Sequence, residues 1–294
     1  MSHLLQRREF VELLTAGACT LATSGVVMAQ DKPAAERKIV VQTYVYKKVG
    51  PLEIKLDVHR PDDEVVRPVI VWIHGGALIM GHREGIDGRI KKMAEGGGYI
   101  LVSIDYRLAP ESQLPAIIED VEDAFAWIRE NGPTKFHADV GRLAVAGGSA
   151  GGYLTLTAGY RVQPRPTALV SLWGYGDLVG EWYSKPSPHA RHHVSKLSAE
   201  EARKQVMGPP ISDSRDRKGD GGAFYQYCRQ QGIWPKEVSG WDPLTEAKKF
   251  LPYMPLNNVT REYPPHVAHS RHQGHGRAVS EFRADGGGIQ EARR

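Results

Sequence analysis

The sequence predicts an α/β fold, with a mostly parallel central sheet and helices on both of its faces. From Lys38 onward, short β-branched runs alternate with helical patterns, which is typical of such a sheet. The runs up to His59 alternate apolar and polar residues, as half-exposed antiparallel strands do, whereas later runs are apolar throughout. We therefore expect a mixed sheet. The expected strands lie within 39–46, 52–61, 68–76, 99–107, 142–152 and 168–174, and the main helix is expected at 115–132.

The composition fits one large globular domain that binds a small molecule. Of the 294 residues, 41% are hydrophobic and 24% are charged, which is ordinary for a folded domain. The formal net charge is only +4, and the basic residues are scattered among nearly as many acids. Because nucleic-acid-binding proteins gather basic residues on one face, we expect no nucleic-acid partner.

Residues 1–29 resemble a bacterial twin-arginine export signal. Arg7-Arg8 precedes a moderately apolar run from Leu13 to Met28, and the small-residue sequence ending at Ala29 is typical of a cleavage site. The run is shorter than the roughly 20 apolar residues of a membrane span, which argues against the alternative of an uncleaved anchor. We expect a periplasmic or secreted mature protein with no stable membrane span.

The mature domain is expected to cover residues 38–265 and to contain an insertion at about 186–242. That segment is polar, with a helix at 195–206 capped by Ser198 and a loop at 213–222. We interpret it as an insertion lying over the sheet and not as a separate domain.

The first chemical signal is Ser149, which stands in a G-x-S-x-G pattern between an apolar strand and a helix. A serine on so sharp a turn has strained backbone angles, and bulk at Gly147 or Gly151 would collide with the turn. The serine hydroxyl is held at the helix N-terminus, where the helix dipole stabilises a developing oxyanion. The pentapeptide alone occurs by chance in roughly one chain in ten, so a plain Gly-rich turn is the alternative.

Two further elements precede this serine. The sequence HGGA, residues 74–77, ends an apolar strand, where flexible backbone can aim amide N–H groups at the same oxyanion. The sequence SIDYRLAPE, residues 103–111, ends the next strand. There we expect Asp105 and Arg107 to pair and to hold neighbouring loops.

With these three elements in order, the mature domain resembles α/β-hydrolases, specifically esterases and lipases of the hormone-sensitive lipase type. The resemblance implies that Ser149 is the nucleophile and that the amides of Gly76, Ala77 and Ala150 form the oxyanion hole. It implies a positional and not a basic role for His74. The family usually has a third glycine where this chain has Ala77, a change that leaves the backbone N–H in place.

The implied reaction is hydrolysis of a small-molecule ester through an acyl-enzyme, with no cofactor and no metal. Ser149 attacks the ester carbonyl, and water then releases the acid. Two alternatives stay open. One is a serine peptidase of the prolyl-oligopeptidase type, which shares the fold, and the other is a non-catalytic binding protein on a hydrolase scaffold.

The chain departs from the family after Pro265, where a late strand, the triad acid and the triad histidine should follow. We find neither the acid nor the histidine in residues 266–294. With one choice of codons, His266 to Val279 read one base later as T-L-L-I-H-G-T-K-D-T-D-V-P, which is the missing strand and acid loop. We hypothesise that one extra base near the His266 codon shifts the frame. The last strands and helix should then be missing, and 266–294 should form a disordered tail.

The same tail spaces four histidines three residues apart, a pattern that also suggests a metal site. Gly274 and Gly276 disfavour the helix that would align them, so we interpret the spacing as an effect of the frame. Elsewhere, Asp177 is expected to cap a turn and not to replace the lost acid, and three histidines of the insertion are expected to be solvated. The tail histidines are His266, His269, His272 and His275, and those of the insertion are His189, His192 and His193.

Overall fold

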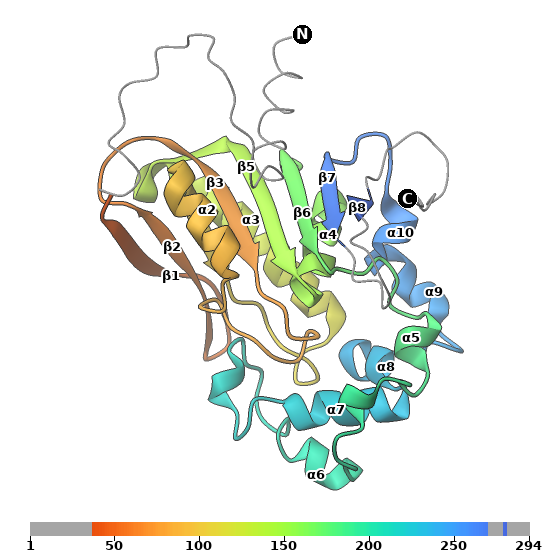
Figure 1. Cartoon of the computed structure of the whole chain (residues 1–294). Helices are drawn as coiled ribbons and strands as arrows, with labels where there is room; N and C mark the ends of the chain where they lie inside the picture. Colours follow the sequence, from red (N-terminus) through yellow and green to blue (C-terminus); the bar gives the residue numbers. More distant parts are fainter. Residues whose placement is uncertain (1–36, 270–278, 281–294) are drawn as a thin grey trace.

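The computed structural model describes residues 37–269 and 279–280, in which eight strands form one sheet (Figure 1). The strands are β1 (Ile39–Val49), β2 (Leu52–Pro61), β3 (Arg67–Ile73), β4 (Ile100–Ile104), β5 (Ala138–Gly148), β6 (Ala168–Leu172), β7 (His266–His269) and β8 (Val279–Ser280). The helices are α2 (Gly88–Gly97), α3 (Leu114–Phe136), α4 (Ala150–Arg161), α5 (Glu181–Ser184), α6 (Ala199–Arg203), α7 (Gly222–Gln231), α8 (Trp234–Ser239), α9 (Ala247–Phe250) and α10 (Pro255–Asn258).

The sheet is mixed, with the order β1-β2-β4-β3-β5-β6-β7-β8. β1 pairs with β2, and β2 with β4, in antiparallel fashion, whereas β4, β3, β5, β6 and β7 are parallel neighbours. This arrangement confirms the expected α/β fold with a mostly parallel sheet. Because strands β3, β5 and β6 run in one direction, the loops that follow them gather at one edge, where α/β proteins place their ligands.

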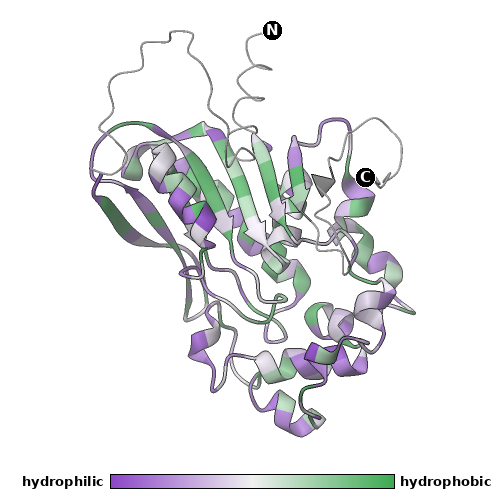
Figure 2. Ribbon diagram, in the orientation of Figure 1, coloured by the Kyte–Doolittle hydropathy of each residue, from purple (hydrophilic) through white to green (hydrophobic). Residues whose placement is uncertain are grey.

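Two apolar layers cover the two faces of the sheet. The larger core lies between the sheet and helices α3 and α4, and it includes Phe125, Phe136 and Leu154. The smaller core lies under α2, where Ile90 and Ala94 pack against Ile70 of β3. Figure 2 shows the central strands in hydrophobic colours and α2 with a largely hydrophilic outer side. The strands that carry the candidate site are therefore held rigidly from both faces.

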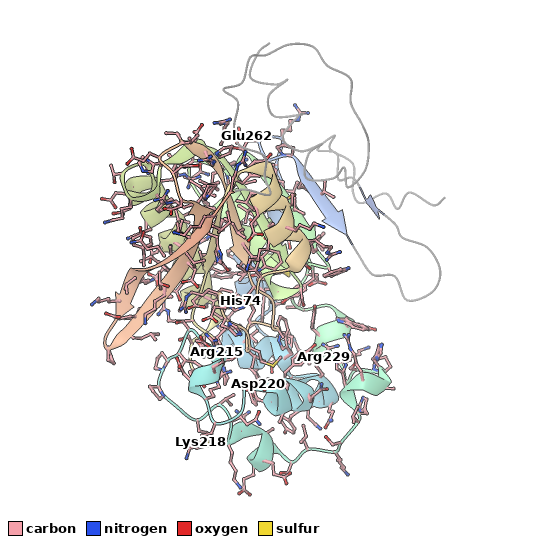
Figure 3. All side chains as sticks on the ribbon, turned by 60° about the vertical axis from the view of Figure 1, so that its left-hand side comes forward. His74, Arg215, Lys218, Asp220, Arg229 and Glu262 are labelled. Carbon is pink, nitrogen blue, oxygen red and sulfur yellow. The ribbon has the colours of Figure 1, made fainter. Side chains whose placement is uncertain are left out.

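The insertion, residues 186–242, folds into short helices beyond the carboxyl ends of the parallel strands (Figure 1). The expected helix forms as α6, and Ser198 caps it in a reciprocal pair with Glu201. Figure 3 shows His74 at the junction between the sheet and this insertion, on the side of Arg215 and Asp220. The insertion thus covers the edge of the sheet at which Ser149 stands.

Strand β7 corrects the expectation that nothing after Pro265 joins the sheet. Residues His266–His269 pair in parallel with β6, and the Leu169 N–H donates to the Pro265 carbonyl at 3.1 Å. Strand pairing uses backbone groups, so the open edge of β6 can accept this segment although two of its four residues are histidines. The proposed export signal and positions 270–278 and 281–294 lie outside the described residues. No helix within the described ranges is both long and apolar enough to cross a membrane.

Candidate active site

Ser149 forms the turn between β5 and α4 by itself, because β5 ends at Gly148 and α4 begins at Ala150. Its backbone angles are φ 55° and ψ −115°. Non-glycine residues adopt such angles at a cost on the order of 1–3 kcal/mol, and they do so mainly at functional sites. The Ser149 N–H donates to the Leu172 carbonyl at 2.7 Å, which ties this turn to β6.

The two glycines around Ser149 stand where no side chain fits. A β-carbon on Gly147 would lie 2.2 Å from the carbonyl oxygen of Gly151. One on Gly151 would lie 1.9 Å from the carbonyl oxygen of Ile73, at the end of β3. The turn can therefore approach β3 this closely only with glycine at both positions.

Residues 75–81, which we call the oxyanion loop, lie directly against this serine. A β-carbon on Gly75 would be 3.4 Å from the Ser149 β-carbon. Three successive residues of the loop have positive φ, at 116° for Gly76, 58° for Ala77 and 63° for Leu78. Ala77 accepts the left-handed conformation in place of glycine at a cost of roughly 1–2 kcal/mol.

Hydrogen bonds on the carbonyls of the loop orient its amides. The Gly76 carbonyl accepts from the N–H groups of Ile79 at 2.9 Å and Met80 at 2.8 Å, and the Gly75 carbonyl lies 2.8 Å from His74 Nδ1. In a trans peptide the N–H points opposite to the C=O, so the amides of Gly76 and Ala77 point away from these bonds. Within the part of the chain that the structure describes, no hydrogen bond uses either amide.

The amide of Ala150 is the third candidate donor. It belongs to the first residue of α4, and the first four N–H groups of a helix have no partner within the helix. It also directly follows the strained serine. All three amides implied by the family resemblance are therefore available at the same edge of the sheet.

His74 is a buried, neutral part of this loop. Its ring stacks on Tyr106 with centroids 4.3 Å apart, and burial lowers the pKa of His74 to about 4. A neutral imidazole carries one N–H, which we assign to Nδ1 because this nitrogen faces the Gly75 carbonyl. His74 thus donates to the loop and holds it. This geometry suits a positional role and not that of a general base.

Asp105 and Arg107 do not pair with each other, contrary to expectation, because each has an oppositely charged group closer on another element. Asp105 accepts from Arg83 Nη1 at 2.9 Å, and burial raises the pKa of Asp105 to about 7. Arg107 forms an ion pair with Asp120 of α3 at 2.7 Å. The Asp105–Arg83 pair still joins the loops that follow β4 and β3, which is the role expected of this region.

Neither a triad acid nor a base reaches Ser149 among the described residues. None of the hydrogen bonds within 37–269 involves its hydroxyl. Asp177 accepts from the Val179 N–H at 2.8 Å and so caps a turn, as expected. His266 begins β7 level with Leu169, at the amino end of the parallel strands, whereas Ser149 follows the carboxyl end of β5.

The histidines of the insertion differ from the expected solvated surface. His192 is buried, with its Nδ1 2.6 Å from the Ser187 hydroxyl oxygen, while His193 is exposed and His189 half-buried. Arg191 Nε donates to His192 Nε2 at 3.1 Å, so the ring proton is on Nδ1 and is donated to the serine. This pair therefore lacks the free imidazole nitrogen that would activate a serine.

The carboxylates that could hold a metal among the described residues are already balanced by a lysine. Glu119, Asp120 and Asp123 of α3 lie close enough to share an ion, but Lys47 Nζ lies 3.0, 3.0 and 2.5 Å from them respectively. An ammonium ion in that place offers the charge that a cation would supply. Of the four tail histidines, His266 and His269 belong to β7, and His272 and His275 lie outside the described residues.

Trp234 and Arg217 of the insertion also contact the oxyanion loop, and no sequence motif predicts these contacts. The Trp234 indole N–H donates to the Ala77 carbonyl at 2.9 Å, and an Arg217 guanidinium N–H donates to the Ile79 carbonyl. These partners are 157 and 138 positions apart in the chain, and no short motif links them.

Sequence comparison relates the chain to α/β-hydrolases. Residues 70–215 match a family model described as the alpha/beta hydrolase fold. The esterase LipI of Mycobacterium tuberculosis is 41% identical over 114 residues, which cover 38% of this chain and 35% of LipI. This chain thus spans about a third of the length of that relative.

Solved structures share the architecture. An α/β-hydrolase superfamily protein from Enterococcus faecalis has a TM-score of 0.60 and 22% identity, with 77% of each chain covered. A hyperthermophilic esterase from the archaeon Pyrobaculum calidifontis has a TM-score of 0.53 and 24% identity, covering 88% of this chain and 68% of that chain. At such identities the likeness shows the fold alone. The family model thus assigns residues 70–215 to the alpha/beta hydrolase fold, and the solved structures share that fold.

Proposed function

We propose that this chain is built for the hydrolysis of carboxylic esters through an acyl-enzyme, with Ser149 as the nucleophile. The observation that carries the proposal is the strained serine lying against a loop with two unbonded amides. In this scheme the Ser149 oxygen attacks the ester carbonyl, and the amides of Gly76, Ala77 and Ala150 stabilise the negative charge on the carbonyl oxygen. The ester C–O bond then breaks, the alcohol leaves with the serine proton, and water hydrolyses the acyl-enzyme to the acid and free Ser149. The esterase LipI, matched above, supports an ester as the substrate class.

Labelling with a fluorophosphonate tests this assignment. We expect the wild-type chain to gain one covalent phosphonyl group at Ser149, detected by intact mass and peptide mapping, because the oxyanion donors stabilise the attacked phosphoryl group. The labelling should be slow, because no described base activates the hydroxyl. Ser149→Ala should abolish the label. Ser187→Ala is the matched control, because its hydroxyl lies beside a histidine but outside the proposed site, and it should label like the wild type. Labelling that survives Ser149→Ala would disprove the assignment.

Turnover by the chain as it stands should be slow, because no acid or base reaches Ser149 among the described residues. Loss of triad members leaves only the acceleration that binding and the oxyanion hole supply. The same observation favours the second candidate, a non-catalytic binding protein on this scaffold. A folded wild-type chain that resists the probe at Ser149 would support that candidate. Faster cleavage of peptides than of p-nitrophenyl esters would instead indicate a serine peptidase of the prolyl-oligopeptidase type.

We also propose that residues 1–29 direct export by the twin-arginine route. The proposal rests on Arg7-Arg8, the apolar run and the small residues before Ala29. Replacing both arginines by lysine should retain the full-length precursor in the bacterial cytoplasm, as read by fractionation and immunoblotting. The matched control is Arg37→Lys, outside the proposed signal, which should leave export unchanged. Equal export of both variants would refute the proposal.

A further inference from the structure

We infer that Trp234, from the insertion, is a positioning residue for the oxyanion hole. This inference rests on the proposed function, because it explains how the amides of Gly76 and Ala77 are held in place. Trp234 is fully buried and begins α8, and its indole N–H donates to the Ala77 carbonyl at 2.9 Å. The insertion therefore reaches the loop at the residue that carries one of the proposed oxyanion donors.

The hydrogen bond from Trp234 holds the Ala77 carbonyl, which accepts no hydrogen bond from within the loop. The amide of Ala77 belongs to the peptide whose carbonyl, on Gly76, accepts from Ile79 and Met80. The carbonyl of Ala77 belongs to the next peptide, and its partner is the Trp234 indole. Because Ala77 and Leu78 have the left-handed conformation that alanine and leucine disfavour, an external hydrogen bond is needed to keep this peptide from rotating.

Further contacts from the insertion continue along the same loop. One guanidinium N–H of Arg217 donates to the Ile79 carbonyl, and another donates to the Ala109 carbonyl at 2.9 Å. Arg217 also forms an ion pair with Glu111 at 2.5 Å, and both side chains are almost fully buried. The insertion therefore holds the carbonyls of two alternate loop residues, 77 and 79.

Ser214 adds the last contact on this loop. The Gly81 N–H donates to the Ser214 hydroxyl at 3.1 Å, and the Ser214 N–H donates to the Gly81 carbonyl at 3.1 Å. With residues 77 and 79, this makes three alternate positions at which the insertion bonds the loop. Peptide groups fixed in this way can stabilise the developing oxyanion without having to reorient during the reaction, which lowers the activation barrier.

The indole itself is held by aromatic neighbours, which makes a conservative test possible. Its ring lies 4.5 Å from the ring of Tyr183 and 5.8 Å, edge to face, from that of Tyr175. Phenylalanine at position 234 keeps an aromatic ring in this cluster and removes the N–H donor together with part of the indole volume. Trp241 is a matched control, because it packs edge to face on Phe250 and its indole N–H makes no hydrogen bond within residues 37–269.

The first measurement is the rate of Ser149 phosphonylation at several concentrations of fluorophosphonate, which separates the maximal rate from the apparent affinity. Trp234→Phe should lower the maximal rate roughly tenfold, less than the 10²–10³ that follows the loss of an oxyanion donor itself. The apparent affinity should match that of Trp241→Phe, while the melting temperature should be lower because the smaller ring leaves a cavity at the fully buried position 234. If the role of Trp234 is merely structural, the variant loses stability but keeps the maximal rate of the wild type.

The second measurement is amide hydrogen exchange of the peptide that covers the oxyanion loop, which needs no reactivity at Ser149. We expect Trp234→Phe to speed exchange of residues 76–81 at least about threefold, while Trp241→Phe leaves it unchanged. If Trp234→Phe speeds exchange of the loop but the probe labels Ser149 in no variant, the positioning role is supported and the proposed function is wrong. Equal exchange and equal labelling in the two variants would overturn the positioning role.

If Trp234→Phe folds poorly, a second variant, Arg217→Lys, tests the same role. Arg217→Lys keeps the charge opposite Glu111 but cannot reach the Ile79 and Ala109 carbonyls with two separate N–H groups. It should lower the maximal rate of phosphonylation and speed exchange of residues 76–81 in the same direction. If both properties stay at wild-type values in this variant, the insertion does not position the loop.

Discussion

Deleting one base at the codon for His266 is expected to raise ester hydrolysis by roughly four orders of magnitude or more, the size of effect that restoring a catalytic triad has. The acid lies in the restored loop, and the histidine is expected in the residues translated after it. In the restored frame, T-L-L-I takes the place of His266–His269 and H-G-T-K-D follows. Strand β7 already pairs with β6 at this position, and its last residue is level with Leu172. An acid loop after that strand begins at the carboxyl edge of the sheet, where Ser149 stands.

The measurement is kcat/KM for p-nitrophenyl acetate, with translation continuing to the next stop codon in the restored frame. The matched control carries the same deletion together with Ser149→Ala and should fall back to the rate of the present chain. Restored activity that survives in this control would come from another group. If the deletion leaves the rate unchanged although the longer chain folds, the frameshift hypothesis is wrong.

Replacing Gly151 by alanine is expected to unfold the site and to cost more than about 4 kcal/mol of the free energy of unfolding, which places it among the most damaging single substitutions. The added β-carbon would lie 1.9 Å from the Ile73 carbonyl oxygen and 2.6 Å from that of His74. Both obstacles are backbone atoms of β3 and the residue after it, so no side chain can turn aside to make room. Either α4 or the end of β3 must move, and Ser149 moves with α4.

Urea unfolding of the purified variant measures this cost, and the fluorophosphonate label measures the loss of the site. Gly96→Ala is the matched control, because Gly96 lies in helix α2 and a β-carbon there would meet nothing within 4 Å. It should raise stability by roughly 0.5–1 kcal/mol, as alanine does in place of a helical glycine. A Gly151→Ala chain with wild-type stability and full labelling would show that the turn is not as tight as described.

The fold was largely predictable because its signals are local. The apolar runs of β3, β4, β5 and β6 and the turn at Ser149 are each contained in fewer than a dozen consecutive residues. The main helix was expected to end at Gly132, yet α3 continues through Pro133 to Phe136. Burial of the Phe136 ring in the larger core favours the extra turn over the local preference of glycine and proline to end a helix.

The site was predictable only where its parts share one stretch of chain. Gly147, Ser149 and Gly151 form one pattern, and Gly76 and Ala77 form another. The partners of Asp105 and Arg107 were missed because charge pairing depends on which loops the fold brings together, which the spacing of the two residues does not reveal. Trp234 was missed for the same reason, since its bond to Ala77 joins positions 157 apart.

The contacts between the insertion and the oxyanion loop limit which residues of the insertion can change without affecting the site. A segment that covers the site is the natural place to alter which esters fit, since it can change without disturbing the sheet. Here the same segment carries Trp234, Arg217 and Ser214, whose hydrogen bonds hold the loop with two of the proposed oxyanion donors. Under the proposed function, changes in this segment should therefore alter substrate preference and rate together. Libraries that vary the insertion should hold these three positions constant, or selection for a new substrate will mostly return slower variants.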